Sequence, residues 1–158
     1  MIMKVLILLS SILILHSCKK DDIIFKNYQF EKELNNFIKE NEEPQKIIYL
    51  YIVDGKDLYD DVDPEDFGKT FLLFYFGEPS SCNGFYKSFE YKGKQILLYD
   101  FSDKIKFSDL LDIQKGENIC NSDLLIDYAN TTIFKQYYFN KEKKLIEMKR
   151  DGSQRVIE

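Results

Sequence analysis

Acidic residues crowd the segment 54–68, and their type and spacing are those of groups that could bind a cation. Asp61, Asp63 and Glu65 alternate there, as the first ligands of an EF-hand calcium loop do. That motif then requires glycine at its sixth position and glutamate at its twelfth, where this chain has aspartate and leucine. We therefore predict no metal site of this type. A different calcium site stays open, but we expect a solvated acidic loop or an acidic docking surface for a basic partner. The candidate binding residues are Asp57, Asp60, Asp61, Asp63, Glu65 and Asp66.

The first residues have the pattern of an export signal. One positive charge, at Lys4, precedes an apolar run from Val5 to Leu15 that is broken only by two serines. This order is typical of a secretory signal peptide. The run is too short for a membrane-spanning helix, which needs about 20 apolar residues.

The signal ends in Leu15-His16-Ser17-Cys18, which resembles the lipobox of bacterial lipoproteins. The resemblance implies that a diacylglycerol is attached to Cys18, that the chain is cut just before it and that the new amine is acylated. It thus implies a lipid anchor in the bacterial cell envelope, on the periplasmic or surface face of the outer membrane. A plain secretory signal with an incidental Cys18 is the alternative. Lys20-Asp21-Asp22 also resembles a charged signal for export to the cell surface in some Gram-negative bacteria, or it is an ordinary hydrophilic tether.

The chain has one histidine, His16, and it lies in this leader. A mature chain without histidine excludes a Ser-His-Asp triad, a Cys-His pair and a histidine-ligated metal site. Carboxylate pairs remain as catalysts, but no spacing singles out a pair among Glu90, Asp100, Asp112, Asp127 and Glu147. The sequence also lacks a phosphate loop and a dinucleotide fingerprint. We therefore expect no enzyme activity and no cofactor.

Cys82 and Cys120 remain once Cys18 is assigned to lipid. Both lie in turn-like sequence, and an exported protein is in a compartment where disulfides persist. We predict a disulfide between them, which would stabilise the fold by about 4 kcal/mol in the chain-entropy model. Two free thiols are the alternative, and a redox-active pair is disfavoured because the CxxC spacing is absent.

Removing residues 1–17 leaves 141 of the 158 residues and changes the net charge from −5 to −6, since Lys4 is lost. This length suits one globular domain. An acidic chain without a basic stripe argues against a nucleic-acid partner. We divide the chain into a signal peptide at 1–17, a lipidated tether at 18–26 and a single domain at 27–158.

The domain has one long amphipathic helix and several β-rich runs. We predict the helix over 28–41, because Phe30, Leu34, Phe37 and Ile38 form a single apolar stripe. The runs 46–53 and 70–76 predict buried strands, covered on both faces. A hairpin is predicted over 85–101, short helices near 108–113 and 122–128, and a three-stranded meander over 131–157. The fold class is α+β: a mostly antiparallel sheet of about six strands with the N-terminal helix packed on one face.

Tyrosines are frequent on the predicted strands. Most of them would belong to the core, but on an exposed sheet face they would form a recognition surface, since Tyr is enriched in binding sites. They are Tyr49, Tyr51, Tyr75, Tyr86, Tyr91, Tyr99, Tyr137 and Tyr138.

Together these features predict a lipid-anchored envelope lipoprotein with a non-enzymatic binding domain. Its partner would be another protein or a ligand, and one specific version is an immunity-type protein that blocks a basic toxin. The alternatives are a carboxylate-dependent hydrolase of envelope or extracellular glycans, and a structural or assembly lipoprotein.

Overall fold

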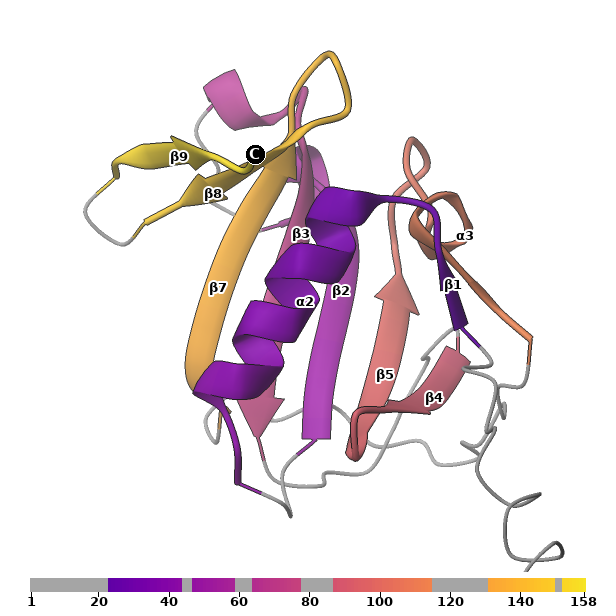
Figure 1. Cartoon of the computed structure of the whole chain (residues 1–158). Helices are drawn as coiled ribbons and strands as arrows, with labels where there is room; N and C mark the ends of the chain where they lie inside the picture. The colour runs from indigo at the N-terminus through magenta and orange to yellow at the C-terminus, as the bar shows by residue number, and fades with distance from the viewer. Residues whose placement is uncertain (1–22, 44–46, 59–63, 78–86, 115–130, 150–151) are drawn as a thin grey trace, which may run out of the picture.

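The computed structural model describes residues 23–43, 47–58, 64–77, 87–114, 131–149 and 152–158. Its main element is a seven-stranded sheet with one long helix against it (Figure 1). In these residues no helix is both long and apolar enough to cross a membrane. The strand order is β4-β5-β2-β3-β7-β8-β9. The strands are β2 (Ile47–Asp54), β3 (Thr70–Gly77), β4 (Lys87–Tyr91), β5 (Lys94–Asp100), β7 (Thr131–Phe139), β8 (Leu145–Met148) and β9 (Gln154–Val156).

The α+β class is confirmed, but the predicted sheet was wrong in two respects. The sheet has seven strands in the described residues, and it is mixed. β2 pairs with β5 in parallel, with Tyr51 opposite Tyr99, whereas its other neighbour β3 is antiparallel. The parallel pair arises because the hairpin β4–β5 returns to the far side of β2 instead of continuing beside β3. The hairpin itself and the C-terminal meander β7–β8–β9 form as predicted.

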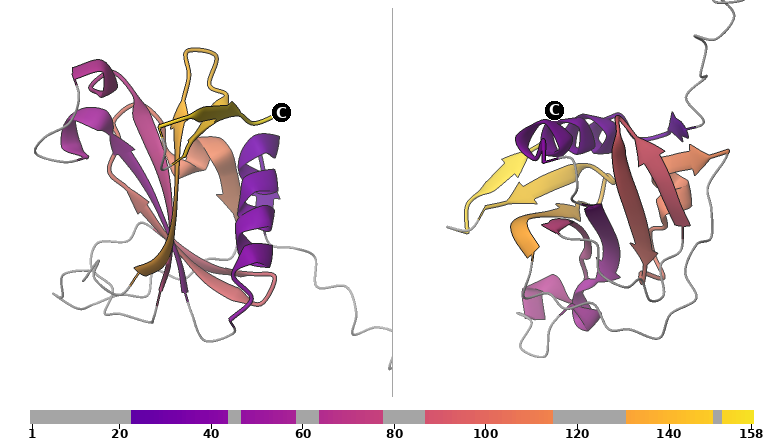
Figure 2. Two further views of the ribbon diagram at one scale, coloured as in Figure 1. Left: turned by 90° about the vertical axis from the view of Figure 1, so that its left-hand side faces the viewer. Right: turned by 90° about the horizontal axis from the view of Figure 1, so that it is seen from below.

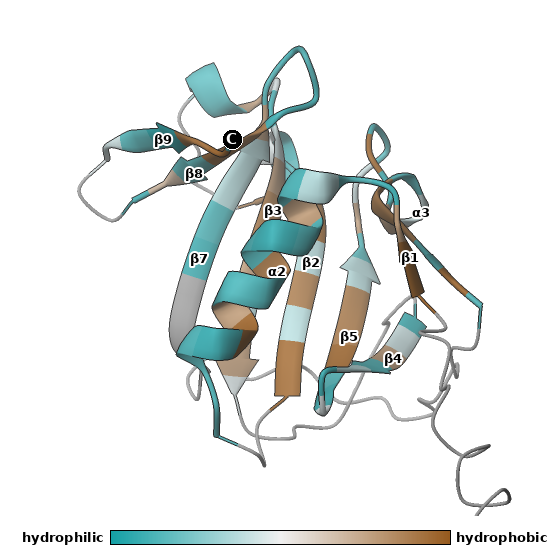
Figure 3. Ribbon diagram, viewed as in Figure 1, coloured by the Kyte–Doolittle hydropathy of each residue, from teal (hydrophilic) through white to brown (hydrophobic). Residues whose placement is uncertain are grey.

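The helix α2 (Tyr28–Glu40) begins at an N-cap, where the Asn27 side chain accepts a hydrogen bond from the backbone N–H of Phe30 at 2.9 Å. The apolar stripe lies against the sheet, and its four members Phe30, Leu34, Phe37 and Ile38 are buried. The outward side of the helix is hydrophilic (Figure 3). The predicted helix and its position on one face of the sheet are therefore confirmed.

Two short strands form a second ladder beside the helix. β1 (Ile23–Phe25) pairs antiparallel with β6 (Leu111–Ile113). Residues 23–25, which we had assigned to the tether, are thus part of the fold. The helix predicted near 108–113 is shorter: α3 (Phe107–Leu110) ends where β6 begins, because β6 takes part in the ladder with β1.

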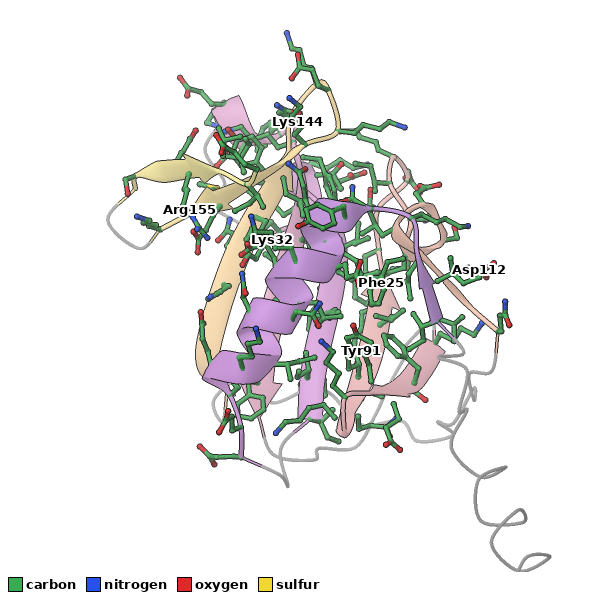
Figure 4. The ribbon with its side chains drawn as sticks, in the orientation of Figure 1. Phe25, Lys32, Tyr91, Asp112, Lys144 and Arg155 are labelled. Atoms are coloured by element: carbon green, nitrogen blue, oxygen red, sulfur yellow. The ribbon has the colours of Figure 1, made fainter. Side chains whose placement is uncertain are left out.

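The aromatic ring of Phe25 fixes β1 to the edge of the main sheet. Its centroid lies 5.2 Å from that of Tyr91, at the end of β4, in an edge-to-face arrangement. Figure 4 shows both side chains on the same side of α2. Such pairs contribute about 0.5–1.5 kcal/mol beyond their buried area, so β1 is held by side chains as well as by its ladder.

Both faces of the central strands are buried, as predicted for β2 and β3. One face packs against α2 through Ile48, Leu50 and Ile52 and their neighbours. The opposite face carries a second apolar cluster, composed of Tyr49, Tyr51, Val53, Phe71, Leu73, Leu97 and Tyr99. We call this second surface the tyrosine face.

Candidate ligand-binding site

Stacked aromatic rings form the centre of the tyrosine face. The parallel register places Tyr51 of β2 opposite Tyr99 of β5, and their rings stack with centroids 4.5 Å apart and planes 13° apart. Phe101, just after β5, extends the stack, with its centroid 6.2 Å from that of Tyr99. Tyr75 of β3 meets Tyr51 nearly at right angles, at 5.3 Å and 84°. Two strands on opposite sides of β2 therefore supply aromatic walls that are perpendicular to each other.

A cavity of about 820 Å³ opens at these rings. Its lining among the described residues is mainly apolar and comes from Tyr51, Val53, Asp57, Leu58, Leu73, Tyr75 and Phe101. Phe101 is 54% exposed, whereas Tyr51 is buried. The volume lies within the range of about 300–1,000 Å³ that is common for small-molecule sites. The cavity is thus large enough and apolar enough to hold a small organic ligand.

Two 3₁₀ turns, which we call the rim turns, follow β2 and precede β3, and the first of them places Asp57 in the lining of the cavity. They are η2 (Gly55–Asp57) and η3 (Pro64–Asp66), and Figure 2 shows them on the side of the sheet opposite α2. Gly55 fits so closely against η3 that an added Cβ would lie 1.9 Å from the carbonyl oxygen of Asp66. The Gly55 N–H also donates to the Lys69 carbonyl at 2.9 Å. The rim is therefore fixed by backbone contacts, and glycine is required at its start.

The buried carboxylate of Asp54 stabilises the start of the rim through hydrogen bonds. Its Oδ1 accepts hydrogen bonds from the hydroxyls of Thr70 at 2.8 Å and Ser102 at 2.7 Å, and its Oδ2 accepts one from the backbone N–H of Asp103 at 3.2 Å. Burial disfavours the charged carboxylate, but these three donors outweigh it and hold the pKa of Asp54 below its ordinary value. Asp54 thereby ties the ends of β2, β3 and β5 together, which is a structural role.

The charged side chains of the rim turns form ion pairs of unequal strength. Asp57 is about half exposed, and its Oδ2 lies 3.9 Å from Nζ of the equally exposed Lys56, which is a weak contact. Lys69 is held more firmly, with its Nζ 2.5 Å from Asp66 Oδ1 and 4.9 Å from the centroid of the Tyr138 ring. The hydrogen bond to Asp66 raises the pKa of Lys69 against the opposing effect of burial.

The helix face holds one buried polar cluster. The Tyr137 hydroxyl donates to Glu33 Oε2 at 2.8 Å, and Arg155 of β9 lies 3.5 Å from the same oxygen and 2.7 Å from Glu147. Burial, with the Glu33 carboxylate nearby, raises the pKa of Tyr137 far above its ordinary value, so this phenol stays protonated. The cluster joins α2 to the C-terminal meander, and the side chain of Glu33 is fully enclosed. We assign it a structural role.

Each described carboxylate that could have formed a catalytic pair is either exposed or engaged by a donor or a cation. Glu90 and Asp112 are exposed, and Glu147 is paired with Arg155. Asp100 accepts from the Phe107 N–H at 3.4 Å and lies 3.7 Å from Lys106, while burial raises its pKa. In the described part of the chain, no three His, Cys, Asp or Glu residues are grouped as metal ligands. Asp127 lies outside that part.

The structure describes half of the residues predicted for the acidic loop. Asp57 lines the cavity, whereas Glu65 is exposed and Asp66 partly buried on the neighbouring turn. Asp60, Asp61 and Asp63 lie outside the described residues, as do Cys18, Cys82 and Cys120. The lipid attachment and the disulfide therefore stay predictions.

Part of the cavity lining could be anticipated from the sequence. Tyr51 and Tyr75 were predicted as core or recognition residues. Leu73 lies in a predicted buried strand and Phe101 in the predicted hairpin, but no binding role was predicted for them or for Leu58. Alternate residues of β2 and of the segment 97–101 are aromatic or apolar, and a period of two places them on one face. That signal could have located the face, although not the cavity.

Comparison of the chain with protein-family models, with curated proteins and with solved structures finds no match. The function must therefore be inferred from the geometry of the chain itself.

Proposed function

We propose that this chain is a lipid-anchored lipoprotein of the bacterial cell envelope whose domain binds a ligand without chemical conversion. The anchor is supported by the leader, which ends in the lipobox-like Leu15-His16-Ser17-Cys18. The binding role is supported by one observation above all, the cavity on the tyrosine face. Its walls are aromatic, its rim is fixed by backbone contacts, and Asp57 supplies a carboxylate beside an apolar interior.

Binding is favoured over catalysis because of where the carboxylates lie. Asp57 is the one acidic residue in the described lining of the cavity, whereas a glycosidase needs two carboxyl groups at a set separation across the bond that it cleaves. The buried carboxylate near the rim, Asp54, accepts hydrogen bonds from three donors. These groups suit the recognition of a ligand better than acid–base chemistry on one.

The test is cross-linking of the lipidated protein in its own cells, followed by purification and mass spectrometry of the proteins and small molecules that come with it. Phe101→Ala removes an exposed wall of the cavity and should not disturb the core. Phe67→Ala is the matched control, because Phe67 is 50% exposed and is absent from the described lining. We expect one ligand to be enriched with the wild type and with Phe67→Ala, and to be lost with Phe101→Ala. Identical recovery with all three proteins would overturn the proposed site.

A further inference from the structure

We infer that the cavity on the tyrosine face binds a small organic cation, an alkylated ammonium group on a compact apolar body. This inference rests on the proposed function and adds the chemical class of the ligand. It follows from the aromatic walls and from the carboxylate at the rim. It also follows from Lys69, whose ammonium group already contacts a tyrosine ring and a carboxylate on the same face of the sheet.

The walls offer electron-rich ring faces, which attract cations. Tyr51 and Tyr75 meet at 84°, and Phe101 adds a third ring to the lining. Aromatic rings set at such angles form cages for quaternary and methylated ammonium groups, because the negative face of each ring attracts the positive charge. A neutral ligand would gain the apolar contact with these rings but not this attraction.

Asp57 gives the cavity its charge. It is the one acidic side chain among the described lining residues, and none of these residues is basic, so the described lining is net negative. Its partner Lys56 lies outside the described lining and contacts it at 3.9 Å from an exposed position. Such exposed pairs are weak, so an incoming cation that is shielded from water inside the cavity can compete with Lys56.

Lys69 shows the same recognition within the chain. Its ammonium lies over the Tyr138 ring at 4.9 Å and contacts the Asp66 carboxylate at 2.5 Å. Tyr138 packs against the tyrosine face, and Asp66 belongs to the rim turn η3. A tyrosine ring together with a carboxylate of the rim turns therefore already binds an ammonium group on the same face of the sheet.

The shape of the site favours a small molecule over the side chain of a docked protein. A cavity of about 820 Å³ can enclose a ligand of drug-like size. A lysine side chain would fill only part of it. We therefore commit to a free small cation as the occupant.

Choline and 3,3-dimethylbutan-1-ol provide a direct test, because they share one shape and differ in charge. Each is titrated at millimolar concentrations into the lipidated full chain in a neutral maltoside detergent, with binding measured by calorimetry. Detergents with choline headgroups must be avoided, since they would compete. We expect choline to bind at least about tenfold more tightly than the alcohol, the ratio that corresponds to roughly 1.4 kcal/mol.

Three variants test which charge determines the affinity for choline. Asp57→Asn should reduce choline affinity about tenfold and leave the binding of the alcohol unchanged. Glu65→Gln is the matched control: it removes the same charge from the neighbouring turn, outside the described lining, and should have little effect. Lys56→Gln should strengthen choline binding, because it removes the competing ammonium. This gain cannot be mimicked by a loss of folding.

Equal affinity for choline and the alcohol would overturn the cation inference and leave the proposed binding function in place. The same holds if Asp57→Asn and Glu65→Gln have equal effects. Failure of both probes to bind would also overturn the cation inference. The proposed function itself is tested separately, and it fails if the cross-linking pattern does not depend on Phe101.

Discussion

Asp54 is the residue on which the rim of the cavity depends most directly. An asparagine at this position keeps one oxygen for the hydroxyls of Thr70 and Ser102, but it presents an amide where the Asp103 N–H needs an acceptor. Asp54→Asn should therefore lower the free energy of unfolding by about 2 kcal/mol, measured by urea denaturation. Asp103→Asn is the control, since that side chain is exposed and only its backbone donates. Equal effects of the two changes would contradict the role given to Asp54.

Acid should remove the same contribution. Because the folded-state pKa of Asp54 lies below its ordinary value of 3.8, its stabilising effect is complete above that value and is lost as the pH falls through the folded-state pKa. We expect the free energy of unfolding of the wild type to drop more steeply than that of Asp54→Asn below about pH 4. Parallel pH profiles would show that the carboxylate is not held in its charged form.

Tyr137 and Tyr138 are adjacent in sequence but lie on opposite faces of β7, which gives a second matched pair. Tyr137→Phe leaves the buried Glu33 carboxylate without its donor at 2.8 Å, and should cost about 1–3 kcal/mol of stability. Tyr138→Phe removes an exposed hydrogen bond to Gln154 and should change stability by less than about 0.5 kcal/mol. Thermal unfolding of both variants measures the two losses of stability. A larger loss for Tyr138→Phe would contradict the structural role that we assign to the buried cluster.

The rim turns depend on the close approach of Gly55 to η3. Gly55→Ala should force the two turns apart, with a cost of about 1–3 kcal/mol and weaker ligand binding, because the added Cβ would overlap the Asp66 carbonyl oxygen. Gly68→Ala is the control, since a Cβ there meets nothing within 4 Å. Denaturation and choline titration of both variants test the rim, and equal behaviour of the two would exclude a special role for Gly55.

Helices and strands with a local residue pattern could be predicted from the sequence, whereas the pairing of the strands could not. The apolar stripe of α2 predicts a helix because its spacing matches 3.6 residues per turn. β2 and β3 are continuous apolar runs because both of their faces are buried. The parallel pairing of β2 with β5 depends on where a hairpin docks after a long connection, which no local pattern encodes. β1 and β6 have three residues each and stabilise one another, so neither is recognisable alone.

The candidate site could likewise be predicted only in part. Asp57 and the tyrosines could be selected by residue type, but Phe101 and Leu73 enter the lining through the register of β5 and β3 against β2. The burial of Glu33 was also unexpected, since a glutamate in the first turns of a helix is ordinarily solvated. Its partners Tyr137 and Arg155 are more than a hundred residues away.

The described chain starts at β1, on the helix side of the sheet, and the rim turns lie on the other side (Figure 2). The five residues 18–22 can span at most roughly 17 Å. With the proposed lipid at Cys18, the first described strand would therefore begin no farther than this from the lipidated residue.

Lipid attachment itself has a simple test. Cys18→Ser should abolish labelling with radioactive palmitate and move the protein from the membrane fraction to the soluble fraction, since two or three acyl chains provide the anchor. Cys82→Ser is the control and should stay in the membrane. A Cys18→Ser protein that remains labelled and membrane-bound would show that the lipobox resemblance is misleading.

The cavity on the tyrosine face as the binding site is the central claim, and NMR of the aromatic rings tests it most directly. The full chain, carrying ¹³C-labelled Phe and Tyr, would be titrated with a small-molecule extract of its own cells. We predict that the ring signals of Tyr51, Tyr75 and Phe101 shift, whereas those of Phe30, Phe37 and Phe76 on the helix face do not. Shifts confined to the helix face, or none at the three cavity rings, would contradict the account.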